Sequence, residues 1–453
     1  MKLTYGISDK PKFGQLIVFA IQQLLAIMAA TLVVPVITNG NAGLTGEDAM
    51  STAAALFGAG IGTLVYVLFT KGKSPVFLGS SFAFLGSMAA AFAGAVSVQA
   101  GYLGLILGAV FAGLVYVVIA LIIKIAGVKW INKVMPAVVI GPTVAIIGLS
   151  LAGNAVGDLQ TAPAGGSSKI AIVCGLVTLA VTMLCSTFGK KMMKLIPFII
   201  GILAGYLVAA IFTVIGNVAG IDALKVVNFA PLTDLVANGV NLNTFVSVPD
   251  FTFMTAIKGI KDIDGGYLAT LAVAYVPVAF VVFAEHLADH KNISSIIEKD
   301  LLEDPGLHRT LLGDGIGSIA GSIFGGCPNT TYGESVACVA ITGNASVATI
   351  ITAAIGALLI SFFNPFVAFV NSIPACVMGG VCMALYGFIA VSGLKMIQKV
   401  NLEANKNLFV ASVILIAGIG GLTVSFGAVT LTSIACALIL GILANVMLNK
   451  GED

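Results

Sequence analysis

Residues 326–335 read GCPNTTYGES, and they interrupt a sequence that is almost entirely apolar on both sides. Asn, two Thr, Tyr and Glu follow a Pro here, between segments built from Ile, Val, Leu, Ala and Gly. In a membrane, a polar break of this kind is tolerated only where it faces a cavity or is buried in protein. We therefore expect this stretch to line a pocket near the middle of a bilayer.

The composition of the whole chain supports a membrane setting. Of 453 residues, 58% are hydrophobic and 9% are charged, whereas a water-soluble domain carries about 25% charged residues. The net charge of +2 comes with no basic stripe and interleaved aromatics, so no nucleic-acid partner is expected. The seven Cys all fall in apolar segments without a CxxC spacing. They indicate packing rather than disulfides or metal binding, and we expect no cofactor.

Fourteen apolar segments can be marked along the chain, most of them long enough to cross a bilayer as a helix. They cover residues 16–38, 51–70, 76–95, 103–123, 137–152, 170–188, 195–216, 267–289, 309–325, 327–343, 346–368, 374–394, 408–426 and 429–448. With the N-terminus inside, 18 of the 22 Lys and Arg residues fall on the cytoplasmic side, as the positive-inside rule requires. This predicts a multi-pass protein of the cell membrane with both termini cytoplasmic.

Two pairs of matching segments indicate an internal repeat. GAGIGTLVYVLF at 58–69 matches GDGIGSIAGSIF at 313–324, and MPAVVIG at 135–141 matches IPACVMG at 373–379. These pairs join the second predicted span to the ninth and the fifth to the twelfth. Because the two members are seven spans apart, an odd number, the second half must be inverted relative to the first. Inverted repeats are typical of secondary transporters.

The same repeat pairs the opening stretch with a second polar break. The third predicted span contains LGSSFAFLGS at 78–87, and it corresponds to the tenth span, which contains the PNTTYGE of residues 328–334. Interrupted spans at corresponding places in two halves point to a binding site built from broken helices. We therefore expect one pocket between spans three and ten.

Acidic residues are rare inside the predicted spans. Glu285, Asp314 and Glu334 are the three that fall there. A carboxylate in hydrocarbon is costly, so such residues usually face a cavity and act on a substrate or on protons. Glu334, beside the polar break, and Glu285 are the stronger candidates. Asp314, flanked by Gly on both sides, fits a bond to a neighbouring helix better than a functional role.

His286 and His290 lie four residues apart, as do the two ligands of an HExxH zinc site. The residue after His286 is Leu rather than Glu, and no third ligand is evident. A membrane metalloenzyme is therefore the weaker interpretation. An ion channel is also a weaker interpretation, because the polar breaks occur once per half rather than as a ring.

At these residues the chain resembles a known family. FAEHLADHKNISSIIEKDLLEDPGLHR at 283–309, followed by PNTTYGE and AITG, is similar to the uracil permeases. These belong to the nucleobase–cation symporter family, which also includes xanthine and ascorbate transporters. The likeness extends from about residue 10 to residue 448, and LGSSFAF at 78–84 matches as well.

The resemblance implies an all-α fold of fourteen spans in two inverted sevens, with short antiparallel strands in spans three and ten. A core domain would comprise residues 1–135 (spans 1–4) and 267–372 (spans 8–11). A gate domain would comprise residues 136–266 (spans 5–7) and 373–453 (spans 12–14). Members are similar in being dimeric proton symporters of the lipid bilayer. The resemblance therefore implies a homodimer that imports uracil with protons by alternating access, and not an enzyme.

The resemblance also implies which residues bind the base. Glu285 and Glu334 would accept hydrogen bonds from its ring N–H groups, and the backbone amides of Phe82 and Gly333 would meet its carbonyl oxygens. The remaining substrate-binding positions are Ser81, Ala30, Tyr332 and Tyr386, with aromatic faces that suit a flat ring. Proton coupling would involve Glu285 and Asp289. No basic residue lies in the segments expected to form the pocket, which favours a neutral cargo.

Some positions depart from the pattern of the family. Some members have His where this chain has Asp289 and Gln23. Purine-transporting members carry an Asn where this chain has Ser335. The sequence therefore favours uracil and leaves xanthine or another purine as the alternative cargo.

Overall fold

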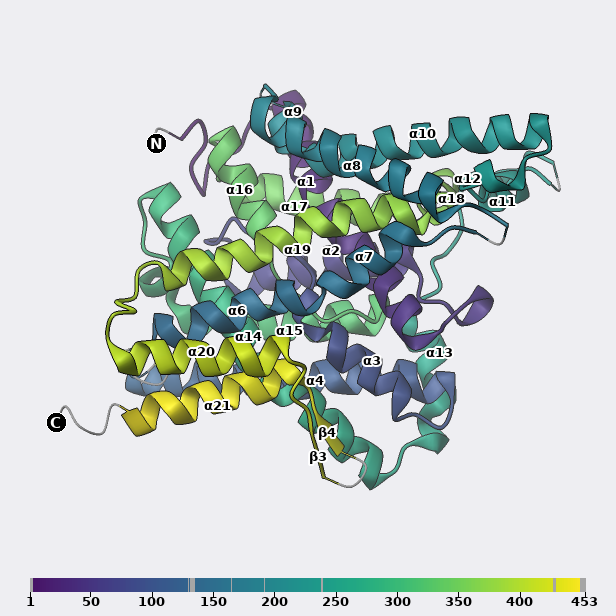
Figure 1. Cartoon of the computed structure of the whole chain (residues 1–453). Coiled ribbons are helices and arrows are strands. Elements are labelled where there is room, and N and C mark those ends of the chain that lie inside the picture. Colours follow the sequence, from purple (N-terminus) through teal and green to yellow (C-terminus); the bar gives the residue numbers. More distant parts are fainter. Residues whose placement is uncertain are drawn as a thin grey trace.

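The computed structural model describes residues 3–128, 130, 135–163, 165–190, 192–237, 239–426 and 429–448. The described part is a bundle of helices with four short strands (Figure 1). Both chain ends, residues 1–2 and 449–453, on which the prediction of cytoplasmic termini depends, lie outside the described residues. So do five of the basic residues that support the predicted orientation: Lys2, Lys129, Lys133, Lys191 and Lys450.

Within the described residues, eight apolar helical segments are long enough to cross a membrane. Six are single helices: α1 (Phe13–Ala42), α4 (Val98–Ala126), α8 (Ser168–Phe188), α10 (Pro197–Ala219), α14 (Gly265–Ile297) and α19 (Ala375–Ile397). The other two join a short helix to a longer one: η1 (Gly46–Asp48) with α2 (Thr52–Phe69), and α6 (Ala137–Ser150) with α7 (Ala152–Gln160). The chain is therefore a multi-pass membrane protein, and the count of fourteen crossings stays a prediction.

Several predicted spans are shorter or broken helices in the structure. They comprise β1 (Leu78–Ser80), η2 (Phe82–Phe84) and α3 (Leu85–Ala93); α15 (Leu307–Gly325); β2 (Asn329–Thr331) and α16 (Gly333–Thr342); α17 (Val347–Ile360) and α18 (Asn364–Ser372); α20 (Asn405–Ile419); and α21 (Ser433–Leu448). The connecting elements are α9 (Met192–Leu195), η3 (Asp222–Leu224), α11 (Ala230–Asp234), α12 (Leu242–Phe245), α13 (Thr252–Ala256), η4 (Ile257–Asp262), η5 (Leu302–Gly306), β3 (Val424–Phe426) and β4 (Val429–Leu431).

Helices α2 and α15 pack against each other through the glycines of the matching segments. A Cβ atom on Gly62 would lie 2.8 Å from the carbonyl oxygen of Gly317, and one on Gly58 would overlap the carbonyl oxygen of Gly321. Real Cβ atoms do not approach a carbonyl oxygen this closely, so only glycine permits the two helices to pack at this distance. Small residues have the same use wherever membrane helices cross closely. Gly62 and Gly317 occupy equivalent positions of the two matching segments.

The polar breaks of the two halves meet as a small sheet. Gly326, with φ of 73°, ends α15 in the left-handed conformation and turns the chain into β2. Strand β2 then pairs antiparallel with β1 in the register Leu78↔Thr331, Gly79↔Thr330 and Ser80↔Asn329. The short antiparallel strands expected in these two breaks are therefore present. Each strand leads into a short helix, and the two paired strands are buried.

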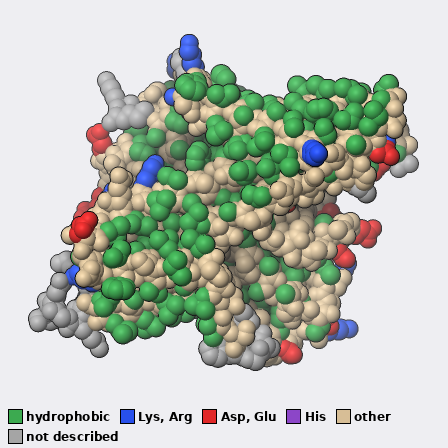
Figure 2. Space-filling model, viewed as in Figure 1, with side chains coloured by type: hydrophobic (Ala, Val, Ile, Leu, Met, Phe, Trp, Pro, Cys, Tyr) green, Lys and Arg blue, Asp and Glu red, His purple; other side chains and the backbone are tan. Residues whose placement is uncertain are grey.

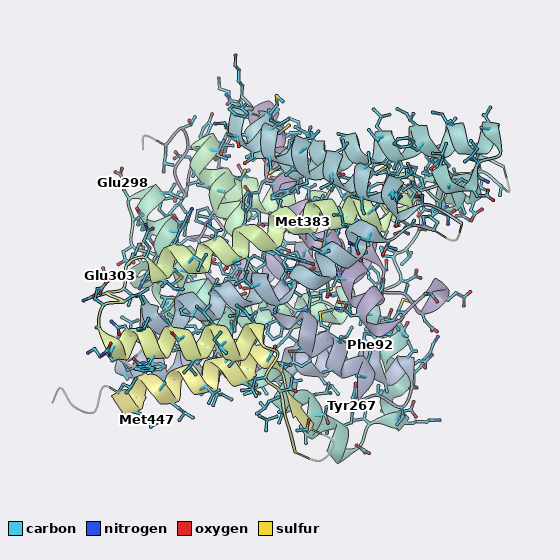
Figure 3. All side chains as sticks on the ribbon, viewed as in Figure 1. Phe92, Tyr267, Glu298, Glu303, Met383 and Met447 are labelled. Atoms are coloured by element: carbon cyan, nitrogen blue, oxygen red, sulfur yellow. The ribbon has the colours of Figure 1, made fainter. Side chains whose placement is uncertain are left out.

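Helix α14 is longer than the sequence predicts. It continues past the predicted end at residue 289 to Ile297, and His290 within the extension is completely buried. Figure 3 shows Tyr267, near its start, and Glu298, just after its end, toward opposite edges of the molecule. At about 1.5 Å per residue, its 33 residues span about 50 Å.

The outer helices present apolar side chains to their surroundings. Only 33% of the most apolar window of α8 and of α10 is buried, against 67% for α1. Figure 2 shows hydrophobic side chains over α8, α10, α20 and α21, with most of the visible charged residues nearer the edges of this face. Exposed leucines and isoleucines on α10 therefore suit contact with lipid rather than water.

Candidate functional site

A cavity of about 330 Å³ lies between α14, α16, α19 and α6, and the start of α10 also lines it. In Figure 1, α6 and α19 run alongside each other, and α16 lies on the other side of α19 from α6. The volume is at the lower end of the range of about 300–1,000 Å³ that is usual for small-molecule sites. The polar side chains of its lining are those of Glu285, Asp289, Glu334, Lys194, Ser186 and Ser392, and the backbone of Gly333 lies among them.

Helix α14 contributes two carboxyl groups, those of Glu285 and Asp289. Residues four apart on a helix share one face, and both of these side chains line the cavity and are half-buried. The carboxylate of Asp289 also accepts a hydrogen bond from the hydroxyl of Thr331 in β2, at 3.0 Å. This bond positions Asp289 against β2, the strand within the opening polar stretch.

Helix α16 begins inside the cavity. Its first residue, Gly333, is exposed, and no side chain caps this end of the helix. The first amides of a helix have no partners within it and carry a partial positive charge. The second residue, Glu334, is half-buried and also lines the cavity. A Cβ atom on Gly333 would lie 3.8 Å from the carboxylate of Asp289, so the start of α16 faces α14 directly.

Three of the predicted site residues lie in the packed region around the strands rather than in the lining of the cavity. Tyr332 is buried, and its hydroxyl donates to the carbonyl oxygen of Ser80 at 2.7 Å. Ser81 is buried, and its backbone N–H donates to the carbonyl oxygen of Pro328 at 2.8 Å. Ala30 is buried in α1. The bonds of Tyr332 and Ser81 therefore join the two broken spans next to the strands that precede η2 and α16.

Phe82 and Tyr386 form an aromatic contact beside the cavity. Their ring centroids are 5.7 Å apart and their planes are inclined by 79°, an edge-to-face arrangement that aromatic pairs favour. Phe82 lines a second cavity rather than the first, whereas Leu385 and Ile389 on the helix of Tyr386 line the first. The structure therefore brings Glu285, Glu334, Gly333 and Asp289 together and places the aromatic pair at their side.

Several residues of the lining were not predicted from the sequence. Leu385, Ile389, Ser392 and Met396 of α19 line the cavity at helical spacing, so the position of Tyr386 together with the period of the helix could have indicated them. Lys194, in α9, also lines the cavity. A basic residue was not expected in the pocket segments, and the short loop helix that contains Lys194 gives no signal of its own.

The ring nitrogens of the two histidines of α14 bond to protein groups. The ring nitrogens of His286 contact Asp314 (Nδ1 to Oδ2, 2.7 Å) and Thr310 (Nε2 to Oγ1, 3.0 Å). Nδ1 of His290 contacts the carbonyl oxygen of His286, at 2.8 Å. Both nitrogens of His286 are thus engaged by protein groups. Among the described residues, no group of three His, Cys, Asp or Glu side chains is arranged to hold a metal ion.

The contacts of Thr310 indicate which nitrogen of His286 carries a proton. Its hydroxyl donates to the carbonyl oxygen of Leu307 at 3.1 Å, so its oxygen accepts from the Nε2–H of His286. The contact between Nδ1 of His286 and Oδ2 of Asp314 therefore contains one proton, bound to one of these two atoms. Asp314 is completely buried and bonded to a neighbouring helix, as the structural interpretation of this acid required.

Comparison with known proteins gives a full-length match. A family model described as "Permease family" matches residues 14–426. The chain is 37% identical to the uracil permease of Bacillus subtilis (strain 168), covering 100% of this chain and 97% of that protein. It is 35% identical to the uracil permease of Escherichia coli (strain K12), covering 96% of this chain and 92% of that protein.

Solved structures share the fold at low sequence identity. The transmembrane domain of the cyanobacterial bicarbonate transporter BicA matches with a TM-score of 0.61 at 15% identity, covering 97% of this chain and 100% of that chain. The murine anion transporter Slc26a9, in an inward-facing state, matches with a TM-score of 0.60 at 11% identity, covering 97% of this chain and 69% of that chain. At these identities the likeness concerns the fold alone.

Proposed function

The chain belongs to the permease family, which makes it a transporter rather than an enzyme, and we propose that it imports uracil together with protons across the cell membrane. The observation that carries this proposal is the meeting of Glu285 and Glu334 with the exposed start of α16 in one cavity. The uracil permeases among its full-length relatives support the choice of cargo. Xanthine remains the competing cargo that the experiment below must separate.

The chemistry of uracil fits the groups around the cavity. Its two ring N–H groups need acceptors, which Glu285 and Glu334 supply. Its two carbonyl oxygens need donors, and the first amides of α16, starting at Gly333, are available because no side chain caps that end. The flat ring suits the aromatic pair of Phe82 and Tyr386, which lies beside the cavity.

The acids give the cavity a means of coupling to protons. Glu285, Asp289 and Glu334 all line it, and three carboxylates at close quarters repel one another. A proton that binds with uracil removes one of these charges, so the binding of one favours the binding of the other. Glu285 and Asp289, one turn apart on α14, are the groups we propose for this proton.

The arrangement of helices supports alternating access between two moving parts. Helices α2, α4, α15 and α17 of the proposed core (residues 1–135 and 267–372) pack on one another, as do α6, α8, α19 and α20 of the proposed gate (residues 136–266 and 373–453). The cavity lies where α14 and α16 of the core face α6 and α19 of the gate. Rocking of one part against the other around this site is common to inverted-repeat transporters.

The packing of α2 on α15 supports the inverted repeat itself. Contacts between Gly58 and Gly321, Gly62 and Gly317, and Tyr66 and Gly313 run in opposite directions along the two helices. Gly62 and Gly317 are equivalent in the two matching segments, and the other two contacts exchange under that equivalence. A two-fold axis between the halves would produce this pattern. We further propose fourteen crossings, cytoplasmic termini and a homodimer, as the resemblance to the family implies.

Uptake by purified protein in vesicles tests this function. We expect saturable uptake of labelled uracil that requires an inward proton gradient, and a Glu285→Gln variant that loses the gradient-driven accumulation. Unlabelled xanthine should not compete. Competition by xanthine at the concentrations at which uracil competes would indicate that the cargo is a purine. Full gradient dependence in Glu285→Gln would show that Glu285 does not couple uptake to protons. A Glu303→Gln variant, which changes an exposed acid of η5 outside the cavity (Figure 3), is the matched control.

A further inference from the structure

A second cavity, of about 230 Å³, is lined in part by Phe82, which does not line the cavity of the acids. Three of the elements that line it are the end of α1, the start of α3 and the start of α21, with Asn41, Ser87 and Ser433 among their lining residues. Ser150 and Asn154 line it from the end of α6 and from α7. None of the lining residues that the structure describes is charged.

Two helices run past both cavities in the same order. On α6, Val144 lines the first cavity and Ser150 lines the second. On α1, Ala26 lines the first and Asn41 lines the second. At about 1.5 Å per residue these steps are about 9 Å and about 22 Å along the helices. Both helices therefore place the second cavity C-terminal to the first, and the contact between Phe82 and Tyr386 joins the lining of the second cavity to α19, which lines the first.

A side-chain hydrogen bond crosses the second cavity. The amide of Asn154 donates to the side-chain oxygen of Asn41 at 3.0 Å. It joins the last turn of α1, a helix of the proposed core, to α7, which packs on α8 and α19 of the proposed gate. Motion between these two groups of helices would break this bond and expose both amides to the cavity.

We propose that the second cavity is a transient binding site for a small neutral heterocycle with an imide edge, the same class of ligand as the proposed cargo, on its way to or from the acids. This inference rests on the proposed function. A primary amide presents one donor and one acceptor side by side, which matches the adjacent N–H and C=O of an imide. Asn41 and Asn154 therefore exchange their bond to each other for bonds to the ligand. Phe82 offers its ring to the same ligand as it passes.

The described residues that line the second cavity are uncharged, so we expect the two cavities to differ in their dependence on protons. The second cavity has no described carboxyl group with which to bind a proton, so binding there is independent of the gradient, whereas binding at Glu285 and Glu334 depends on it. The hydroxyls of Ser87 and Ser150 already donate to the carbonyl oxygens of Ala274 and Ile147, so they offer mainly acceptor lone pairs. We therefore expect weaker binding in the second cavity than in the first.

Protection of engineered cysteines by uracil tests the proposal. Ser150→Cys reports on the second cavity, Ser392→Cys on the first, and Thr233→Cys, on an exposed loop helix outside both, is the control. The native cysteines are buried, and their background labelling is measured in the parent protein. We expect uracil to slow labelling at Ser150→Cys and Ser392→Cys at least three-fold, and to leave Thr233→Cys unchanged.

The Glu334→Gln background separates direct from indirect protection. There we expect the uracil concentration that protects Ser392→Cys to rise about 10-fold, and the concentration that protects Ser150→Cys to stay as in the parent. A rise of the same size at both positions would mean that uracil acts on the second cavity only through the first, and would overturn the second site. Protection of Ser392→Cys alone in the parent would do the same while leaving the uracil permease in place. Protection at neither position would remove the proposed function and this inference together.

The amide pair is tested by the same labelling without ligand. Asn154→Ala and Asn41→Ala each remove the bond across the second cavity, and we expect either change to speed labelling of Ser150→Cys. The double variant should be no faster than the singles, because both remove one bond. Unchanged rates in the single variants would show that the two amides do not restrict access.

Discussion

The side-chain amide of Gln23 in α1 donates a hydrogen bond to the hydroxyl of Ser335 in α16. The same hydroxyl accepts the backbone N–H of Phe77, just before β1, at 2.9 Å. All three groups are buried. One serine thus joins the first helix, the first strand and the half-helix that begins in the cavity, one residue after Glu334.

Replacing Ser335 with Ala should leave two buried donors without an acceptor. An unsatisfied buried polar group costs about 1–3 kcal/mol, so we expect a lower Tm in detergent and several-fold weaker uracil binding, because α16 loses its attachment to β1. Ser335→Thr, which keeps the hydroxyl, should recover part of both. Thermal unfolding and equilibrium binding measure the two effects, and an unchanged Tm in Ser335→Ala would show that the donors find other partners.

Gly62→Ala tests the close approach of α2 and α15. The added Cβ would lie 2.8 Å from the carbonyl oxygen of Gly317 and against the amide of Asn329 at 2.5 Å. Overpacking of this kind costs about 1–3 kcal/mol, and it would displace the strand that contains Asn329. We expect a lower Tm and loss of transport. Gly387→Ala is the control, because a Cβ on Gly387 meets nothing within 4 Å, and an equal loss there would refute the packing argument.

The pair of His286 and Asp314 should behave as a unit. His286→Leu and Asp314→Leu each leave the other side chain buried without its partner, whereas the double variant removes both. Hydrogen bonds between membrane helices contribute about 0.6–2 kcal/mol. We therefore expect the loss of unfolding free energy in the double variant to be smaller than the sum of the losses in the two single variants. The difference should be about 0.6–2 kcal/mol. Unfolding free energies of the four proteins complete the cycle, and additive losses would show that the pair is not coupled.

Much of the site could be predicted from the sequence, because charged residues are scarce in the apolar segments. Glu285 and Glu334 stand out in apolar segments, and the structure places both in one cavity. The matching Gly-rich segments similarly pointed to α2 and α15, which pack through Gly62 and Gly317. In each case a residue type that is costly or unusual in a membrane helix marked a position where the fold requires it.

The rest depended on contacts between distant parts of the chain. The sequence ended the eighth span at residue 289 because polar residues follow, but α14 continues and buries His290. The hydroxyl of Tyr66, 2.7 Å from Nε2 of His290, supplies the missing partner from α2. Lys194 reaches the cavity from a short helix outside the predicted pocket segments. Hydropathy along one segment contains no information about such partners.

Asp304 predicts a pH effect on stability outside the membrane spans. Its carboxylate lies 2.6 Å from Nζ of Lys73 and 3.0 Å from Nζ of Lys299, and these hydrogen bonds lower its pKa below the usual 3.8. A lowered folded pKa stabilises the protein above pH 3.8, and this contribution disappears as the pH falls through the folded value. The Tm of the parent should exceed that of Asp304→Asn near pH 6, and the gap should narrow on acidification. A gap that is constant with pH would exclude the titration of Asp304 as its cause.

Glu334 should determine how tightly the base binds. A hydrogen bond to a charged group contributes about 1.5–3 kcal/mol, against about 0.5–1.5 for a neutral one, so Glu334→Gln should raise the Kd for uracil about 10-fold. The amide of Gln also presents N–H donors toward the N–H groups of the base, which adds to the loss. Asp289→Asn, whose position faces the start of α16 but bonds to Thr331, should change the pH dependence of uptake more than the Kd. Calorimetric titration and uptake at several pH values separate the two, and a Kd that is unchanged in Glu334→Gln would place the base elsewhere than at the start of α16.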